Sequence, residues 1–285
     1  MLGLRAPPVT PDRETRLAYD SIEVTPLTAR IGAEIGGVDL RIPTNRQVDE
    51  IGRALVDHQV IFFRDQPMEP AHLSGLGRSF GELAFHSAVP GLPDHPELVA
   101  IHSDKDSKFI AGEDWHSDLT CDEAPPLGSI LYLHTVPPVG GDTLFSSMYA
   151  AYDALSPRMK AYLEGLTAVH DADHVYRPLF PDVDRRYPCN VHPVIRTHPV
   201  SGRRGIFVNS SYVLRIVELP TEESDAVLRF LYRHCANPNF QVRFTWRQHS
   251  VAFWDNRCTQ HMAVWDYFPH TRSGWRATIA GDKPF

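Results

Sequence analysis

The chain of 285 residues has no long hydrophobic run and few cysteines. No apolar stretch approaches the roughly 20 residues that a membrane helix requires, so we expect a soluble protein without a membrane partner. The N-terminus has no signal-peptide pattern, and the four cysteines show no Cys-x-x-Cys spacing; they are Cys121, Cys189, Cys235 and Cys258. These absences favour reduced thiols in a cytoplasmic protein.

Dense basic segments are also absent. The 28 lysines and arginines are outnumbered by 35 aspartates and glutamates, which gives a net charge of −7. This balance argues against a nucleic-acid partner, because such proteins carry a basic patch or stripe. The chain is instead rich in core-forming residues, since 42% are hydrophobic and 10% are aromatic. It is long enough for two domains, but β-barrels of this size are often single domains.

Apolar patterning predicts a mainly β fold with flanking helices. Segments with strand patterns occur within 22–41 and at 60–63, 98–101, 129–133, 194–197, 206–208, 240–246, 251–254, 261–267 and 275–279. Helices are predicted after Thr44, from Pro70 to about Phe80, and at 149–155, 156–165 and 221–234. We therefore predict that residues 20–285 form one jelly-roll (double-stranded β-helix) barrel, preceded by an N-terminal arm of residues 1–19.

The segment 170–187 has no clear period and is rich in Asp, Arg and Pro. Long loops in compact domains are often lids or binding segments. We predict that this one lies over the mouth of a pocket.

The stretch Trp115-His116-Ser117-Asp118 is a candidate metal site. Residues i and i+2 of an extended segment point to one side, so His116 and Asp118 can project into one pocket. A second imidazole would complete the two-His, one-carboxylate arrangement that holds non-haem Fe(II) with positions left open. The pattern alone is weak, because chance gives about 1.8 His-x-Asp/Glu triplets for this composition and three occur: His95-Pro-Glu97, His102-Ser-Asp104 and His116-Ser-Asp118.

Downstream arginines select the second histidine. Three histidines precede an arginine by 11 positions: His174, His192 and His261. Only His261 has another arginine 15 positions later, Arg276. Arg272 and Arg276 are an even number of residues apart and share one face of a strand. Because guanidinium groups hold carboxylates through paired hydrogen bonds, this site implies an anionic cosubstrate, an anionic substrate, or both.

A longer series of motifs carries a family resemblance. In order, the motifs are Trp115-His116-Ser117-Asp118, Gly140-Gly141-Asp142-Thr143, the stretch 254–261, Arg272, Arg276-Ala277-Thr278 and Gly281-Asp282-Lys283-Pro284. From about Val24 to the C-terminus, the chain resembles the TauD/TfdA family of Fe(II)- and 2-oxoglutarate-dependent dioxygenases. Residues 192–285 are especially similar to the taurine dioxygenases of that family.

The resemblance implies a site and a reaction. His116, Asp118 and His261 match the iron ligands, and Thr143 and Arg272 match residues that hold 2-oxoglutarate. With Fe(II), 2-oxoglutarate and O₂, such an enzyme hydroxylates a small organic acid and releases succinate and CO₂. Hydroxylation beside a sulfonate also releases sulfite. The resemblance further implies a homo-oligomer, either a dimer or a tetramer.

The substrate pocket keeps only part of the family pattern. Arg276 and His86 match residues that contact the sulfonate in taurine dioxygenases, whereas Tyr176 and Tyr212 stand where those enzymes have Phe.

Two further positions depart from the pattern, since Val89 replaces a Tyr and Gly112 replaces an Asn. The lost polar groups, and the space expected at both positions, predict an acidic substrate bulkier than taurine. A sulfonate is favoured over a carboxylate.

Other functions stay open at this point. Within the family, the alternatives are an aryloxyalkanoate dioxygenase and an alkyl sulfate ester dioxygenase. Outside it, a zinc hydrolase would also suit two histidines and an aspartate, but it gives no role to Thr143 and Arg272. A barrel that only binds an anion would not be expected to keep all three ligands.

Overall fold

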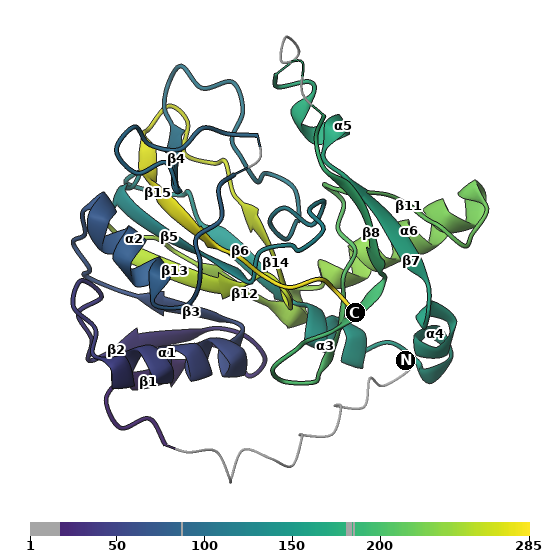
Figure 1. The fold of residues 1–285 in the computed structure, drawn as a ribbon, viewed down its shortest axis with the longest axis horizontal. Helices are drawn as coiled ribbons and strands as arrows, with labels where there is room; N and C mark the ends of the chain where they lie inside the picture. The colour runs from purple at the N-terminus through teal and green to yellow at the C-terminus, as the bar shows by residue number, and fades with distance from the viewer. Residues whose placement is uncertain (1–17, 87, 181–183, 185) are drawn as a thin grey trace.

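The computed structural model describes residues 18–86, 88–180, 184 and 186–285 (Figure 1). Most of the predicted arm of residues 1–19 therefore lies outside the described residues. At its end, Tyr19 packs against the core, and its hydroxyl donates to Asp57 Oδ2 at 2.9 Å. The described chain is mainly β-structure with helices outside it, as predicted.

The major sheet forms one wall of the jelly roll. Its seven strands run in the order β1 (Glu23–Pro26), β2 (Ala33–Gly36), β3 (Val60–Phe63), β13 (Ser250–Asp255), β5 (Gly128–Thr135), β15 (Arg272–Ile279) and β4 (Leu98–Ser103). Neighbours are antiparallel except β2 and β3, which are parallel. Strands from the end of the chain thus lie between strands from its first half.

A minor sheet packs against the major one. Its strands run in the order β12 (Gln241–Phe244), β6 (Thr143–Ser147) and β14 (Thr259–Ala263). Aromatic rings fill the space between the two sheets, where Phe62 stacks on Phe244 with ring centroids 4.0 Å apart and meets Phe145 edge-on. The strand β3 is buried along its whole length, which explains its continuous apolar sequence.

Helices α1 (Asn45–His58) and α2 (Pro70–Arg78) cover the other face of the major sheet (Figure 1). The first begins at the predicted N-cap Thr44, whose hydroxyl accepts from Gln47 N–H in a capping box. Both helices turn apolar residues such as Ile51 and Leu73 toward the sheet, and burial of each contributes about 1.5–3 kcal/mol. No helix in the described ranges combines the length and apolarity needed to cross a bilayer.

A third sheet was missed by the sequence prediction. It has the order β11 (Val213–Ile216), β7 (Thr167–Asp171) and β8 (Cys189–Pro193). A second core joins this sheet to α3 (Met148–Asp153), α4 (Pro157–Leu163), α6 (Thr221–Cys235), the 3-10 turn Pro238–Phe240, and the hairpin of β9 (Ile195–Thr197) and β10 (Arg204–Ile206). The helix α6 agrees with the prediction, and the hairpin is present, but its second strand ends at Ile206, where the predicted strand 206–208 begins.

The segment 170–187 is more regular than predicted. It contains the end of β7 and the short helix α5 (Asp173–Tyr176). Residues 181–183 and 185 lie outside the described residues. Tyr176 and Tyr187 are buried in a small apolar cluster with Leu119, which directly follows a predicted metal ligand. The segment therefore packs beside the candidate site, but its role as a lid stays a prediction.

Candidate active site

Two of the predicted metal ligands form a backbone pair between extended segments. His116 N–H donates to His261 O at 3.0 Å, and His261 N–H donates to His116 O at 2.7 Å. Such reciprocal bonds bring opposite residues close together, and the two imidazole centroids are 4.1 Å apart. Ala263 N–H donates to Gly112 O at 2.7 Å. The 112–116 segment thus extends the minor sheet beside β14.

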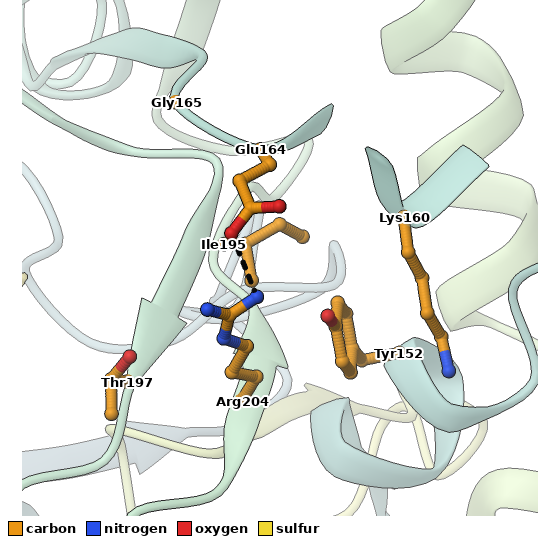
Figure 2. A pocket seen from close by; sticks show the side chains of 7 residues that line it. All are labelled: Tyr152, Lys160, Glu164, Gly165, Ile195, Thr197 and Arg204. Atoms are coloured by element: carbon orange, nitrogen blue, oxygen red, sulfur yellow. Dashed lines mark hydrogen bonds and ion pairs between the residues drawn. The ribbon is translucent and has the colours of Figure 1, made fainter. Parts of the chain in front are cut away.

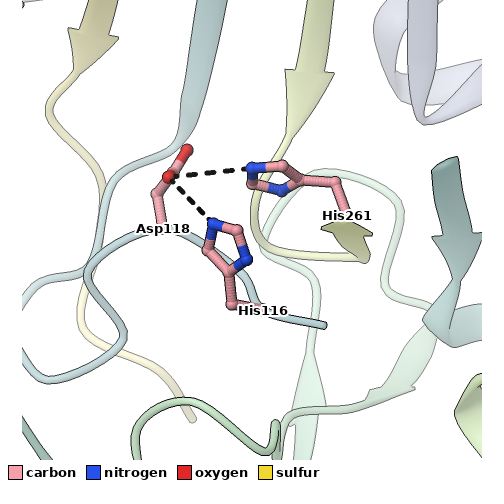
Figure 3. A group of neighbouring side chains, drawn as sticks. All are labelled: His116, Asp118 and His261. Atoms are coloured by element: carbon pink, nitrogen blue, oxygen red, sulfur yellow. Dashed lines mark ion pairs between the residues drawn. The ribbon is translucent and has the colours of Figure 1, made fainter. Parts of the chain in front are cut away.

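The third predicted ligand, Asp118, completes the group. Its Oδ1 lies 3.8 Å from His116 Nε2 and 3.9 Å from His261 Nε2. The three ligand atoms lie within 4.8 Å of one another, and Figure 3 shows the side chains converging. All three residues are buried. The structure therefore brings together the three side chains that the sequence selected.

The proton positions on the two histidines suit metal binding. His116 Nδ1 lies 2.8 Å from Asp114 O. A carbonyl only accepts, so Nδ1 carries the proton and Nε2 presents its lone pair. His261 Nδ1 has no hydrogen-bond partner among the described residues. Burial lowers the pKa of both imidazoles. Both rings are therefore neutral at neutral pH, as metal ligands must be.

Asp118 is held as an anion. Burial alone would raise its pKa, but Arg276 and the nearby imidazoles keep the pKa of this carboxyl below its ordinary value. Ser129 Oγ donates to Oδ2 at 2.7 Å, and Arg276 Nη1 donates to Oδ1 at 2.9 Å. Ser129 thus fixes one oxygen, while the other pairs with Arg276 and faces both imidazoles.

Asn256 also orients Asp118, a role that was not predicted. Its Oδ1 accepts from Trp254 Nε1 at 2.9 Å and from Asp118 N–H at 3.2 Å. Its Nδ2 consequently points to Asp118 Oδ2 at 3.3 Å and to Ser129 Oγ at 3.2 Å. Asn256 belongs to the 254–261 motif of the family resemblance. This was the one signal in the sequence that it belongs to the site.

A second group with metal-binding side chains has a different chemistry. His198, Asp255 and Cys258 are buried within 4.8 Å of one another. Arg257 bonds both oxygens of Asp255, at 2.9 and 2.7 Å. His198 Nδ1 accepts two backbone N–H bonds, so its Nε2 carries a proton and donates to Asp255 Oδ2 at 3.0 Å. Burial raises the pKa of the Cys258 thiol. These residues form a satisfied ion-pair network that leaves no free ligand.

The predicted cosubstrate residue Thr143 has a hydroxyl hydrogen to donate. Its Oγ1 accepts from Trp246 Nε1 at 3.0 Å and lies 3.4 Å from Arg272 Nη2. Since both nitrogens are donors, the hydroxyl hydrogen is free for a third group. Trp246 was not predicted, and its sequence context carried no signal for this contact.

Arg272 is a buried cation without a bonded carboxylate. It is 5% exposed, and its Nε donates to Gly141 O at 3.1 Å. None of the ion pairs between described residues includes Arg272. The charge of Asp142 acts on Arg272, but the carboxylate of Asp142 is bonded to Arg243 at 2.6 Å. Burial lowers the pKa of Arg272 to about 10, so it is charged at neutral pH. A buried charge without a counter-charge is costly, and an anion bound here would remove that cost.

Three of the four predicted substrate residues form a hydrogen-bonded chain, and the charge of the fourth, Arg276, acts on it. His86 Nε2 lies 3.5 Å from Tyr176 Oη, and Tyr176 Oη lies 2.8 Å from Tyr212 Oη. Burial, followed by the charge of Arg276, lowers the pKa of His86 to about 4. Burial raises the pKa of both tyrosines. At neutral pH the group therefore contains three neutral polar side chains beside one cation.

The space expected at Gly112 is absent. Its φ is +81°, and a Cβ built there would lie 2.8 Å from His116 Cε1. The main chain packs against the ligand ring in a conformation that glycine adopts readily. The expectation of an enlarged pocket at this position was therefore wrong.

Side chains around the third sheet anchor the chain that follows Asp118. Thr120 Oγ1 accepts from Asn209 Nδ2 at 3.1 Å and lies 2.9 Å from His170 Nδ1. The next two carbonyls also have partners, with Asn190 Nδ2 donating to Cys121 O at 2.6 Å and His192 Nε2 donating to Asp122 O at 2.8 Å. None of these residues was predicted as part of the site.

A small pocket of about 100 Å³ lies among α3, α4, β9 and β10 (Figure 2). Its lining consists of Tyr152, Lys160, Glu164, Gly165, Ile195, Thr197 and Arg204. Of its three charged residues, Arg204 and Glu164 are exposed and pair with each other at 3.1 Å. The lining includes none of the predicted site residues.

Comparisons with known proteins identify similar proteins along most of the chain. Residues 23–278 match the model of the family described as "Taurine catabolism dioxygenase TauD, TfdA family". The chain is 35% identical to an alpha-ketoglutarate-dependent (2-oxoglutarate-dependent) sulfate ester dioxygenase from Pseudomonas putida, over 92% of this chain and 91% of that protein. It is 31% identical to an alpha-ketoglutarate-dependent sulfonate dioxygenase from Saccharomyces cerevisiae, over 92% and 68%.

This chain is also similar to a solved structure. The crystal structure of a taurine dioxygenase from Burkholderia xenovorans has a TM-score of 0.82 and 36% identity, and the match covers 93% of each chain. The chain therefore belongs to the TauD/TfdA family and is a 2-oxoglutarate-dependent dioxygenase.

Proposed function

We propose that His116, Asp118 and His261 bind Fe(II) and that Thr143 and Arg272 bind 2-oxoglutarate. When bound, the iron activates O₂ for hydroxylation of a substrate C–H bond, coupled to conversion of 2-oxoglutarate to succinate and CO₂. The protein residues supply geometry, charge and exclusion of water.

The observation that carries this proposal is a buried cation, Arg272, that is bonded to no carboxylate of the described residues. Arg272 is charged, buried and without a bonded carboxylate, and it contacts a threonine hydroxyl that has a hydrogen to donate. A dicarboxylate can accept from both side chains, and a guanidinium suits a carboxylate because it offers parallel N–H bonds. A zinc hydrolase would leave this cation without a function.

The donor set also fits a non-haem iron. Two neutral imidazoles and one carboxylate are the protein ligands of the Fe(II) facial triad, which leaves positions open for other ligands. Ser129 and Asn256 hold Asp118 Oδ2, so Oδ1 is the oxygen that faces the two Nε2 atoms. We infer that these hydrogen bonds keep Asp118 in its ligating orientation.

For the substrate, we propose a small organic acid with a sulfonate or sulfate ester group. The relatives named as sulfonate and sulfate ester dioxygenases support this class. Arg276, with His86 near it, supplies the charge that holds the acidic group. An aryloxyalkanoate is the second candidate, since its carboxylate would also pair with Arg276.

Succinate formation tests the proposal. The purified protein is incubated with Fe(II), 2-oxoglutarate and a panel of alkylsulfonates, alkyl sulfates and aryloxy acids. We expect one class of acid to raise succinate formation above the level measured without an acid. His116→Ala, Asp118→Ala and His261→Ala should each abolish it while circular dichroism remains unchanged, because the cores between the sheets do not depend on the metal. Activity that persists with chelator and added Zn²⁺ and ignores 2-oxoglutarate would contradict the proposal.

A further inference from the structure

The ring of His86 has a fixed proton position. Its Nδ1 accepts N–H bonds from Ala88 at 3.0 Å and from Val89 at 3.1 Å. A nitrogen that accepts cannot carry a proton, so the imidazole is neutral and its proton lies on Nε2. This N–H is directed toward the Tyr176 hydroxyl, 3.5 Å away. His86 is thus a neutral donor on the side that faces the tyrosines.

The tyrosine pair leaves one hydroxyl hydrogen unused. Tyr176 and Tyr212 are 7% and 5% exposed, with their oxygens 2.8 Å apart. Two hydroxyls share one hydrogen bond, whichever of them donates it. The second hydrogen therefore has no partner within the pair. Because both residues are buried, a bound group that accepts this hydrogen would satisfy a donor that water reaches poorly.

Arg276 offers a third donor. Its Nη1 is bonded to Asp118 Oδ1 at 2.9 Å. Its Nε is buried and has no hydrogen-bond partner among the described residues. The charge of Arg276 acts on both His86 and Tyr176, so these groups lie in one electrostatic neighbourhood.

We propose that the hydroxyl pair of Tyr176 and Tyr212 determines substrate specificity by donating to a pyramidal –SO₃⁻ head group, together with His86 and Arg276. This inference rests on the proposed function and adds the kind of substrate that the site selects. The preferred substrate carries a sulfonate or sulfate ester on an uncharged chain, and both carboxylates and aminosulfonates bind less well.

The geometry of the acceptor explains the preference over a carboxylate. The three donors come from separate parts of the chain: the segment before β4, the pair formed by α5 and the residue before β11, and β15. A –SO₃⁻ group has three equivalent oxygens that point in three directions. A carboxylate has two oxygens whose preferred acceptor directions lie in one plane. It therefore leaves at least one of the three donors poorly matched.

None of the described residues named at this site offers an unpaired carboxylate to an ammonium group. His86 and Arg276 present donors, and the carboxylate of Asp118 is bonded to Arg276 and Ser129. Val89, beside His86, is apolar, and the main chain at Gly112 packs directly on a ligand ring. Burying a charged amine without an acceptor is costly. Taurine is consequently a poorer ligand than an alkylsulfonate of the same size.

The test uses anions that differ in one group. Propane-1-sulfonate differs from taurine by a methyl in place of the ammonium, and from butanoate by its head group. Propyl sulfate distinguishes a sulfate ester from a sulfonate. Each anion is titrated calorimetrically into the complex with Fe(II) and 2-oxoglutarate under argon, where no turnover occurs. The proteins are wild type, Tyr176→Phe, Tyr212→Phe, the double variant, and Tyr187→Phe as a control, since Tyr187 packs on Tyr176 in the same cluster.

We expect wild type to bind propane-1-sulfonate or propyl sulfate at least about tenfold more tightly than butanoate and taurine. Each single variant keeps one hydroxyl hydrogen, so its loss should be below about threefold. The double variant should lose about 10- to 100-fold for the –SO₃⁻ ligands, the range of one hydrogen bond to a charged group. Its affinity for butanoate and 2-oxoglutarate should stay near that of wild type, as should all affinities of Tyr187→Phe.

Three results would overturn the inference. The first is a double variant that binds propane-1-sulfonate as wild type does. The second is an equal loss for butanoate, which would make the effect one of general packing. The third is wild type that binds taurine better than propane-1-sulfonate. If wild type neither binds 2-oxoglutarate nor forms succinate with any acid, the proposed function fails as well. Normal succinate formation, together with unchanged affinity of the tyrosine variants for the –SO₃⁻ ligands, refutes this inference alone.

Discussion

Replacing Arg272 with methionine should abolish cosubstrate binding without destabilising the metal-free protein. The guanidinium is 5% exposed, and no carboxylate of the described residues is bonded to it. Burial lowers its pKa from the ordinary 12.5 to about 10. Because the folded-state pKa is below the unfolded value, folding at any pH below about 10 carries the full cost of holding the charge. That cost is gone only when the pH exceeds the unfolded value.

The magnitude follows from the pKa difference. The step from 12.5 to about 10 corresponds to about 3 kcal/mol. Methionine removes this cost but leaves Gly141 O without its donor, which costs about 1–3 kcal/mol. The free energy of unfolding of Arg272→Met should therefore be unchanged or higher by up to about 2 kcal/mol. Most substitutions of a large buried residue have the opposite effect.

Thermal unfolding measures both consequences. In wild type with Fe(II), 2-oxoglutarate at 100 times its dissociation constant should add about 2.7 kcal/mol to stability. Arg272→Met should start at the same midpoint or higher and show no shift on adding 2-oxoglutarate. A variant that unfolds several degrees earlier and still responds to 2-oxoglutarate would refute the reasoning. Phe244→Ala, in the core between the sheets, serves as a control that should be destabilised by about 3–5 kcal/mol.

Three further predictions concern charged residues. Arg272→Lys should weaken 2-oxoglutarate binding at least about tenfold in calorimetry, since an ammonium lacks the planar two-point contact; equal affinity would mean that the cosubstrate binds elsewhere. Arg276→Ala should weaken acidic substrates by about 30- to 4000-fold, from about 2–5 kcal/mol per buried pair; uncharged analogues that bind wild type equally well would argue against this. Burial raises the pKa of Asp122 to about 6, so its carboxyl destabilises the fold as the pH rises from about 4 through 6. Asp122→Asn should increase the free energy of unfolding by about 1–2 kcal/mol at pH 8 after allowance for solvent screening. Urea unfolding in which wild type and variant show the same pH dependence would contradict this.

The sequence predicted the parts of the molecule that depend on local pattern. The helix after Thr44 and the buried strand at Val60–Phe63 have the expected form, and the strand predicted at 275–279 lies within the longer β15. The metal group could be selected because i, i+2 spacing places two side chains on one side of an extended segment. The choice of His261 required the downstream arginines and the family resemblance.

Features that depend on long-range contacts were not predictable. The buried positions of the strand β7 are Ala168 and the polar residue His170, so its sequence lacks the apolar alternation that indicates a strand. Asn256 bonds Asp118 and Ser129, and Trp246 bonds Thr143; these partners are distant in the sequence, so no local pattern encodes the contacts. Gly112 was interpreted as open space because a sequence shows a missing side chain but not the ring that takes its place. The oligomeric state and the N-terminal arm stay predictions.

The third sheet divides the enzyme into exchangeable parts. The cosubstrate residues Thr143 and Arg272 lie on β6 and β15. Tyr176 and Tyr212 lie instead in the part of the chain that runs from β7 to β11, two strands of the third sheet. A chimera that receives residues 167–216 from a relative would therefore inherit a new tyrosine wall and keep its own cosubstrate site. The graft must bring Asn190 and the two histidines that anchor the chain after Asp118, because a foreign insert without them would leave that chain unsupported. Directed evolution of substrate range in this scaffold should start with libraries confined to that insert.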